Sequence, residues 1–203
     1  MEFEAMVSRQ RAFWNTGATR SVEWRIIQLK KLEQALEERE EALCAALKAD
    51  LGKAAYESWL SEIGMTLGEL RFARKHLKKW AAVKRRPSAM PLFPARSRVV
   101  PQPYGTVLIM SPWNYPVQLT LVPLVSALAA GNCAVVKPSA YAPNVARVVA
   151  ELLGDIFPPE YVSVVQGGRA ENAALLEQDF DYIFFTGSPA VGKTVMAAAA
   201  QHL

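Results

Sequence analysis

The stretch Asp181-Tyr-Ile-Phe-Phe-Thr-Gly-Ser-Pro-Ala-Val-Gly-Lys-Thr194 decides the fold class. It starts with an apolar run that is typical of a buried strand, passes through a short loop at Gly187, and continues in a helical pattern from Val191. Strand and helix alternate in this way four times in the second half of the chain. Near-continuous apolar strands that alternate with helices are typical of a parallel sheet with helices on both faces. We therefore predict an α/β fold with an open, parallel, Rossmann-like sheet.

The pattern also predicts the elements along the chain. The predicted strands are Thr106–Met110, Cys133–Val136, Tyr161–Val165 and Tyr182–Phe185, and the helices between them are Val117–Ala130, Val145–Ile156 and Ala170–Leu176. The first half is helical: one helix ends near Gly17, a longer one runs from an N-cap at Ser21 to Gly52, and a third spans Ser58–Trp80. We divide the chain into a helical part (1–86), a Pro-rich linker with edge strands (87–104) and a sheet core (105–203).

Composition excludes several classes of protein. The chain has 203 residues, of which 51% are hydrophobic and 21% charged, with a net charge of +4. The densest basic cluster lies where a helix ends, so we interpret it as a solvated helix end and expect no nucleic-acid partner; it comprises Lys78, Lys79, Lys84, Arg85 and Arg86. The uncharged stretch between Arg98 and Lys137 is interrupted by prolines and glycines, which favours a buried strand–helix–strand over a membrane segment.

The two cysteines indicate a reducing compartment. Cys44 falls in an apolar helical stripe and Cys133 opens a predicted strand, so both are interpreted as small buried hydrophobes. No disulfide framework and no metal-ligand spacing is present, and a cytoplasmic protein without a metal is expected.

The unusual residues of the second half follow the predicted strands. The loops are Ser111–Pro116, Lys137–Ser139, Gly167–Gly168 and Thr186–Ser188. Open α/β sheets bind ligands just outside the carboxyl ends of their strands. If the strands are parallel, these four loops meet at one edge of the sheet.

Each loop has a chemical and a structural interpretation. Asn114 could donate to a developing oxyanion or could cap the next helix. Lys137 could bind an anion or hydroxyl groups, or could reach solvent. The pair Gly167-Gly168 allows close backbone approach of a ligand or a tight turn. The free N–H groups where the last helix begins, beside Gly187 and Ser188, could bind an anion, or Ser188 could be an ordinary N-cap.

The segment Gly187–Thr194 also fits the Walker A pattern G-x-x-x-x-G-K-[ST], which indicates a P-loop NTPase. Such an enzyme needs an acidic residue for Mg²⁺, yet no acidic residue follows Thr194, and the pair Trp113-Asn114 stays unexplained. The ordinary dinucleotide fingerprint G-x-G-x-x-G is absent after the first predicted strand. A module that binds a dinucleotide without chemistry is a further alternative.

Six segments together resemble one known family. They are Pro103–Val107, Ser111-Pro-Trp-Asn-Tyr-Pro116, Ala129–Asn132, Val136-Lys-Pro-Ser139, Gly167-Gly168 and Phe185-Thr-Gly-Ser188 with Val191-Gly-Lys193. In this order they resemble the aldehyde dehydrogenase superfamily over essentially the whole chain, most closely its class 3, fatty-aldehyde type. The resemblance implies an NAD(P)-dependent oxidoreductase that converts aldehydes to carboxylic acids.

The resemblance also implies residue roles. Asn114 is the expected catalytic residue, donating to the aldehyde oxygen, and Lys137 is expected to bond the adenosine ribose of NAD or NADP. The remaining cofactor-binding residues that it implies are Met110, Ser111, Pro112, Trp113, Ser139, Ala140, Gly167, Gly168, Thr186, Gly187, Ser188, Val191 and Gly192. A homodimer is expected for the complete enzyme, and an aldehyde is its substrate.

Two departures from the family pattern matter. Ala140 stands where the family commonly has a Glu that accepts from ribose hydroxyls and repels a 2′-phosphate, so NADP should be tolerated. The family's catalytic Glu and nucleophilic Cys are expected beyond Leu203, and neither Cys44 nor Cys133 matches the nucleophile motif. The chain is therefore expected to be an incomplete cofactor-binding domain that does not turn over substrate by itself.

Overall fold

A four-stranded parallel sheet forms the centre of the molecule in the computed structural model, which describes residues 2–202. The strands are β3 (Thr106–Met110), β4 (Cys133–Lys137), β5 (Val162–Val164) and β6 (Tyr182–Phe185), in the order β5-β4-β3-β6. Met110 at the end of β3 pairs with Lys137 of β4 on one side and Phe185 of β6 on the other. The strands therefore end in line, and the predicted α/β fold is confirmed.

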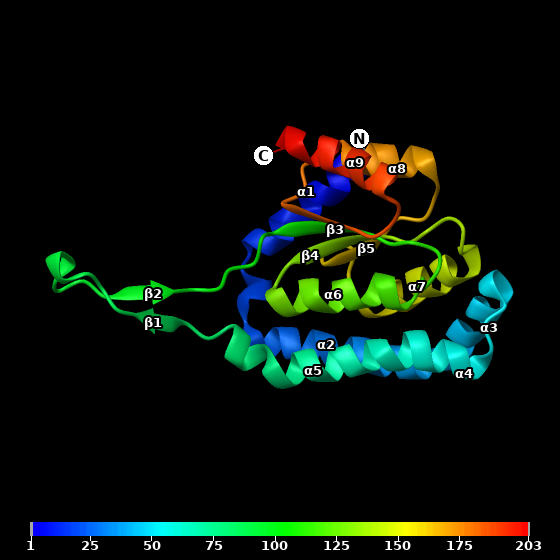
Figure 1. Cartoon of the computed structure of the whole chain (residues 1–203), viewed down its shortest axis with the longest axis horizontal. Coiled ribbons are helices and arrows are strands. Elements are labelled where there is room, and N and C mark those ends of the chain that lie inside the picture. The colour runs from blue at the N-terminus through cyan, green and yellow to red at the C-terminus, as the bar shows by residue number, and fades with distance from the viewer. Residues whose placement is uncertain (1, 203) are drawn as a thin grey trace.

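The helices form layers on both faces of the sheet (Figure 1). They are α1 (Glu2–Asn15), α2 (Val22–Glu38), α3 (Glu40–Leu51), α4 (Ala55–Ser58), α5 (Gly64–Trp80), α6 (Gln118–Ala130), α7 (Pro143–Ile156), α8 (Arg169–Leu176) and α9 (Pro189–Ala199). In Figure 1, α6 and α7 cover one face and are backed by α2 and α5, while α1, α8 and α9 cover the other. Short 3₁₀ segments at Ala18–Arg20, Met90–Leu92 and Ala200–His202 complete the chain.

The two faces of the sheet build two separate cores because neighbouring side chains of a strand point to opposite faces. Val107 and Ile109 of β3 join the larger core beneath α6 and α7. Leu108 and Met110 join the smaller core beneath α1, α8 and α9. All five residues of β3 and of β4 are buried. This double burial explains why these strands are apolar throughout rather than alternating.

The helical half differs from the prediction in two places. The predicted helix from Ser21 to Gly52 is capped as expected, since the Ser21 side chain accepts from the Trp24 N–H and Gly52 adopts a left-handed conformation. It is broken at Arg39 into α2 and α3, and no local signal marks this break. Arg39 pairs with Asp155 of α7 at 2.5 Å, and α3 packs on α7, so tertiary contacts set the break.

The predicted helix Ser58–Trp80 contains a segment of wider turn. Residues Trp59–Ile63 (η2) are π-helical and join α4 to α5. The N–H of Gly64 reaches the carbonyl of Trp59, and a Cβ on Gly64 would lie only 2.9 Å from that oxygen. A π turn changes the direction of the side chains that it carries, and such turns are frequent at functional sites. Glu62 lies within it and is completely buried.

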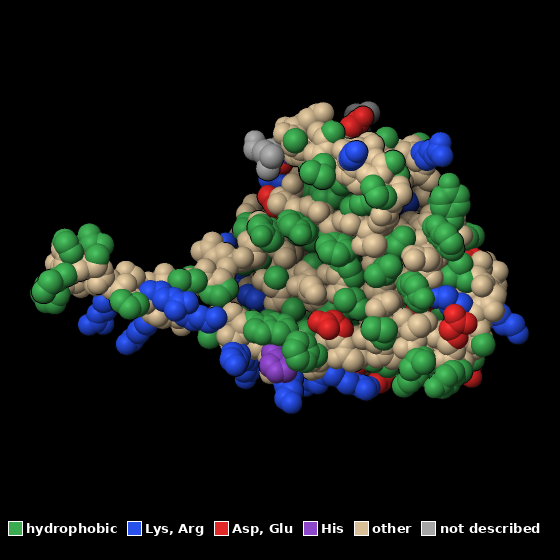
Figure 2. All heavy atoms as spheres, viewed as in Figure 1, with side chains coloured by type: hydrophobic (Ala, Val, Ile, Leu, Met, Phe, Trp, Pro, Cys, Tyr) green, Lys and Arg blue, Asp and Glu red, His purple; other side chains and the backbone are tan. Residues whose placement is uncertain are grey.

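The predicted Pro-rich linker is the tip of a hairpin. Strand β1 (Lys84–Arg86) pairs antiparallel with β2 (Ser97–Val99), and the hairpin projects from the body, as Figure 1 shows. Hydrophobic side chains gather at its tip and Lys and Arg side chains along it (Figure 2). The prediction missed β1 because three consecutive basic residues have no apolar pattern. The predicted division at residue 86 separates the two paired strands. The wider division into three parts stays a prediction.

Between residues 2 and 202, none of the helices combines the length and the apolar character that crossing a membrane requires. The uncharged stretch after Arg98 is, as predicted, strand, helix and strand.

We predict that Gly105→Ala destabilises the fold by at least about 1 kcal/mol. Gly105 has φ +141, and a Cβ there would lie 2.2 Å from Oδ2 of Asp181, the oxygen that accepts from the Thr106 N–H. Gly154→Ala in α7 is the matched control, because a Cβ there meets nothing within 4 Å; it should stabilise by up to about 1 kcal/mol. Urea unfolding of both variants measures the difference. Equal stabilities would contradict the constraint assigned to Gly105.

Candidate cofactor and oxyanion site

The four loops predicted to converge do meet at the carboxyl ends of the strands. The Ser111 N–H donates to the Lys137 carbonyl at 3.2 Å, and the Thr186 N–H donates to the Met110 carbonyl at 3.1 Å. The Val165 N–H donates to the Val136 carbonyl at 2.9 Å. Each loop therefore starts from a strand end fixed by its neighbour. The Met110 side chain is buried in the smaller core, so only its backbone faces the loops, through the carbonyl that accepts from Thr186.

Asn114 lies in the loop between β3 and α6, and its side chain is exposed. It does not cap α6, so that structural alternative is wrong. The cap comes from Glu62 of η2, whose Oε2 accepts from the N–H groups of Val117 at 2.7 Å and Gln118 at 3.3 Å. The Asn114 carbonyl accepts from Nζ of Lys53 at 3.0 Å. The loop is thus held through its backbone, and within residues 2–202 the amide group of Asn114 has no hydrogen-bond partner.

A second set of polar contacts closes the same loop from beneath. The Ser111 and Thr120 hydroxyl oxygens lie 2.5 Å apart, and the Thr120 hydroxyl donates to the Pro116 carbonyl at 2.5 Å. Pro112 and Trp113 lie between these fixed points, and Trp113 is 53% exposed. An indole exposed next to fixed backbone can serve as one wall of a ligand site.

Lys137 does not reach solvent; that alternative is wrong. Only 3% of the residue is exposed, and Nζ donates to the carbonyls of Pro138 at 3.0 Å and Gly167 at 2.7 Å. Burial lowers the pKa of Lys137, and the nearby Glu171 opposes that shift. Two of the three N–H groups of the ammonium are therefore used within the chain. Within residues 2–202 the third has no acceptor, and it could donate to a hydroxyl or phosphate oxygen.

Gly167 and Gly168 bring a carboxylate close to this lysine. Gly167 has φ +137, and a Cβ there would lie 2.5 Å from the Glu171 side chain. Oε2 of Glu171 accepts from the Gly168 N–H at 2.6 Å, which caps α8. Backbone hydrogen bonds from Glu171 and Gly168 lower the pKa of this carboxyl. Glu171 was not among the predicted site residues, although a Glu three residues after Gly168 is a recognisable capping signal.

The loop before α9 has the geometry of a helix start, as predicted for Gly187 and Ser188. Ser188 is the N-cap, and its hydroxyl accepts from the Val191 N–H at 3.4 Å. The Phe185 ring packs where a Cβ on Gly187 would lie, at 2.4 Å, and also faces Gly192. Within residues 2–202, the N–H groups of Gly187 and Ser188 have no hydrogen-bond acceptor. These groups and the helix dipole can hold an anionic group.

The geometry of this loop contradicts the Walker A interpretation. In a P-loop, the Gly-Lys-Thr segment lies at the helix start, where its backbone surrounds the phosphates. Here α9 begins at Pro189, so Gly192, Lys193 and Thr194 lie inside the helix. The Lys193 side chain is exposed. Thr186, Gly187 and Ser188 alone link the strand to the helix, and the spelling of the motif is a coincidence.

The turn after β4 carries the remaining predicted residues. The Ser139 hydroxyl accepts from the Tyr141 N–H at 3.2 Å, which shapes the turn. Ala140 is exposed beside it and brings no charge. Val191 is 46% exposed on the first turn of α9. All predicted site residues therefore lie on or next to the same edge of the sheet, although Gly192 is turned toward Phe185.

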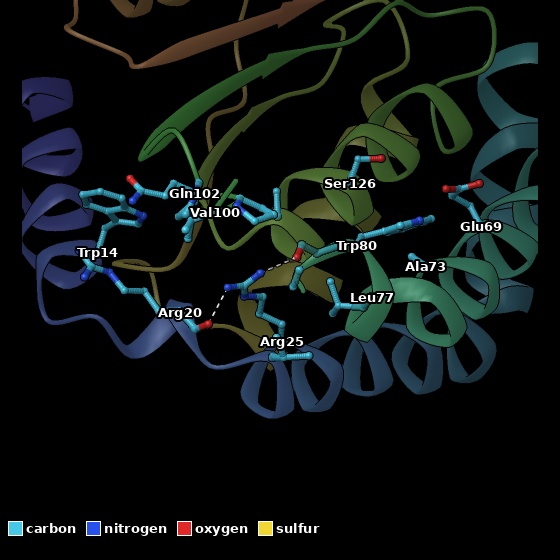
Figure 3. A pocket seen from close by; sticks show the side chains of 16 residues that line it. Trp14, Arg20, Arg25, Glu69, Ala73, Leu77, Trp80, Val100, Gln102 and Ser126 are labelled. Atoms are coloured by element: carbon cyan, nitrogen blue, oxygen red, sulfur yellow. Dashed lines mark hydrogen bonds between the residues drawn. The ribbon is translucent and has the colours of Figure 1, made fainter. Parts of the chain in front are cut away.

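A cavity of about 710 Å³ lies at the opposite, amino ends of the strands (Figure 3). Its lining includes Trp14, Arg25, Leu77, Trp80, Gln102 and Ser126. Arg25 donates to the carbonyls of Thr19, Arg20 and Ala129, and its pKa is lowered chiefly by burial. The Arg25 guanidinium thus satisfies the carbonyls at the end of the Ala18–Arg20 turn and at the end of α6. The cavity is separate from the loops after the strands.

An open parallel sheet with its loops gathered at the carboxyl edge is the architecture of nucleotide-binding α/β domains. Residues 2–203 match the model of the aldehyde dehydrogenase family. The chain belongs to the aldehyde dehydrogenase family. This confirms the resemblance inferred from the six segments.

Individual relatives agree with this assignment. Human aldehyde dehydrogenase family 3 member B1 is 47% identical over 195 residues, which are 96% of this chain and 42% of that protein. A substrate-bound structure of Staphylococcus aureus AldH superposes with a TM-score of 0.96 at 45% identity, covering 98% of this chain and 43% of that one. Betaine aldehyde dehydrogenase from Staphylococcus aureus in complex with NAD⁺ gives a TM-score of 0.87 at 25% identity, covering 99% and 40%. The chain thus spans less than half the length of these relatives.

Neither cysteine has the properties of a nucleophile. Burial raises the pKa of Cys133 to about 12, and burial together with Glu40 raises the pKa of Cys44. Cys133 is fully buried, as predicted, whereas Cys44 is partly exposed at the boundary of the helical layer. A thiol attacks as its thiolate, so a raised pKa suppresses the reactive form near neutral pH.

We predict that iodoacetamide at pH 7.5 leaves Cys133 unmodified in the native chain and labels Cys44 slowly, at less than the rate of free cysteine. Mass spectrometry after timed quenching measures the extent of labelling at each cysteine. Urea-unfolded chain is the control, in which both residues should react equally. Rapid labelling of Cys133 in the native chain would contradict its assigned burial.

Proposed function

We propose that these 203 residues form the cofactor-binding part of an NAD(P)-dependent aldehyde dehydrogenase and supply the amide that stabilises the reacting oxygen. The observation that carries the proposal is the convergence of Asn114, Lys137 and the free N–H groups of Gly187 and Ser188 at one edge of the sheet. An amide donor, an ammonium and a helix N-terminus match a carbonyl oxygen, a ribose and a pyrophosphate respectively. The family membership and the NAD⁺-bound neighbour support it.

The residues present fit a dinucleotide. The helix start at Ser188 offers unused N–H groups to the pyrophosphate, and the third N–H of the buried Lys137 is free for a ribose hydroxyl. Pro112 and Trp113 offer backbone and an indole face along the edge of the sheet. Gly167 has a backbone conformation that favours glycine, and here a Cβ would collide with Glu171. We therefore assign the cofactor-binding roles to these residues and to Met110, Ser111, Ser139, Gly168 and Val191.

Asn114 is the proposed oxyanion donor. Nδ2 of its exposed amide can donate to the aldehyde oxygen as negative charge develops there, and the held backbone of the loop limits the reorganisation that this needs. A bound nicotinamide accepts the hydride from the substrate carbon. Because burial raises the pKa of both cysteines and neither lies in the nucleophile motif of the family, we assign the nucleophile to neither Cys44 nor Cys133.

The partners of the complete enzyme belong to the same proposal. We infer an aldehyde substrate from the family, and a homodimer in which the projecting apolar hairpin tip is covered. The reducing cytoplasm suits two free cysteines.

We predict that the chain binds NAD⁺ and NADP⁺ with affinities within about fivefold of each other, because Ala140 neither bonds the ribose nor repels a 2′-phosphate. Ala140→Glu should weaken NADP⁺ binding at least about tenfold and spare NAD⁺, since two negative charges then face each other. Ala140→Gln is the matched control, of equal shape without charge, and should leave both affinities unchanged.

Isothermal titration calorimetry measures the affinities of the original chain and of both variants for NAD⁺ and NADP⁺. A strong NAD⁺ preference in the original chain would show that another group excludes the 2′-phosphate.

We also predict that the purified chain forms no NADH from NAD⁺ and a medium-chain aldehyde, because the raised pKa of both cysteines disfavours the thiolate that would attack the aldehyde. Absorbance at 340 nm measures this, with a complete aldehyde dehydrogenase as the positive control. Steady NADH formation that survives further purification would refute the assignment of the nucleophile to other residues.

A further inference from the structure

Lys53 and Glu62 form a buried ion pair beneath the loop that carries Asn114. Lys53 Nζ lies 2.5 Å from Oε1 of Glu62, and the two side chains are 10% and 0% exposed. Removing two charges from water is costly, and a buried pair seldom adds net stability compared with apolar residues. The pair therefore calls for an explanation other than stability.

Within residues 2–202, every side-chain polar contact of this pair beyond itself goes to the segment 114–118, which leads from the loop into the first residue of α6. The ammonium of Lys53 donates to the Asn114 carbonyl at 3.0 Å and lies 4.1 Å from the centre of the Tyr115 ring. Oε2 of Glu62 accepts from the N–H groups of Val117 and Gln118. Residues 114–118 are thus held at both ends by one bonded pair of side chains.

The pair also replaces a cap that the loop does not provide. Val117 occupies the N-cap position of α6 and has no side chain that could accept a hydrogen bond. The buried carboxylate of Glu62 takes that place and also favours the positive end of the helix dipole. The π turn at Trp59–Ile63 carries Glu62 into this position.

We propose that Lys53 and Glu62 are positioning residues for Asn114, because together they fix the peptide group that follows Asn114 and the N–H groups where α6 begins, and so hold the backbone from which its amide projects. The proposal rests on the function proposed above. It predicts that the pair acts on the reaction only through Asn114. Oxyanion stabilisation requires a donor at a defined place, and a displacement of about 1 Å can cost about 100-fold in rate.

The test is a double-mutant cycle in the complete gene product that carries these residues. Asn114→Ala should lower kcat about 100-fold or more. Lys53→Met should lower kcat at least about tenfold, with the KM for NAD⁺ within about twofold of the original. In the Asn114→Ala background, Lys53→Met should lower kcat no further. Arg147→Met, which breaks an exposed pair with Glu151 on α7, is the matched control and should leave kcat unchanged.

The outcomes separate the two proposals. A folded Lys53→Met enzyme with the original kcat, or an equal loss in both backgrounds, would overturn the positioning role and leave the proposed function intact. An original kcat in Asn114→Ala would overturn the proposed role of Asn114 and this inference with it.

If Lys53→Met does not fold, Lys53→Arg provides the same test. The planar guanidinium of the arginine can keep the bond to Glu62. It cannot place a compact positive charge against that carboxylate, the Asn114 carbonyl and the Tyr115 ring at the same time. We expect kcat to fall with the melting temperature within a few degrees of the original. Original kcat in this variant would also overturn the proposal.

Discussion

The register of the parallel sheet is the constraint on which the rest of the structure depends. Met110 is aligned with Lys137 and Phe185, so three neighbouring strands end at the same level. A parallel strand needs a crossover helix to reach its neighbour, and the loops that lead into these helices therefore all leave from one edge. Four loops that are up to about 75 residues apart in sequence become one surface for this reason alone.

Buried polar groups then turn this edge into a shaped site. Lys137 and Lys53 are both buried and donate to carbonyls of loop residues, while Glu62 accepts from loop N–H groups. Such groups must be paired where water is excluded, and each pairing fixes a loop in one conformation. The buried apolar strands stabilise the fold, and these few charged side chains fix the conformations of the loops. The cavity near Arg25 is different, because the buried Arg25 guanidinium donates to carbonyls at the ends of the Ala18–Arg20 turn and of α6 rather than to a loop of the site.

The strands of the sheet could be predicted from the sequence, whereas the contacts between helices that position its loops could not. The strands Thr106–Met110 and Tyr182–Phe185 have the predicted bounds, because each is a short, largely apolar run next to a glycine turn. The first is buried throughout, whereas the second lies at the edge of the sheet and alternates between exposed and half-buried residues, so it is not the buried strand that its apolar run indicates. The break at Arg39 and the cap supplied by Glu62 were not predictable, since both depend on contacts between helices far apart in the chain. Glu171 was predictable, because a Glu three residues after Gly168 is a local signal for a helix N-cap. The Walker A alternative, which the absence of an acidic residue after Thr194 already disfavoured, is contradicted by the helix start at Pro189, because a motif predicts chemistry only in its structural context.

The measurement that tests the central claim most directly is a titration of the ¹⁵N-labelled chain with NAD⁺, followed by amide chemical shifts. We predict shifts that gather at the four loops after the strands, with those of Gly187 and Ser188 the largest, because the pyrophosphate would approach their N–H groups. Shifts confined to the cavity around Arg25 and Trp80, or no shifts at millimolar NAD⁺, would contradict a dinucleotide site at the carboxyl edge of the sheet.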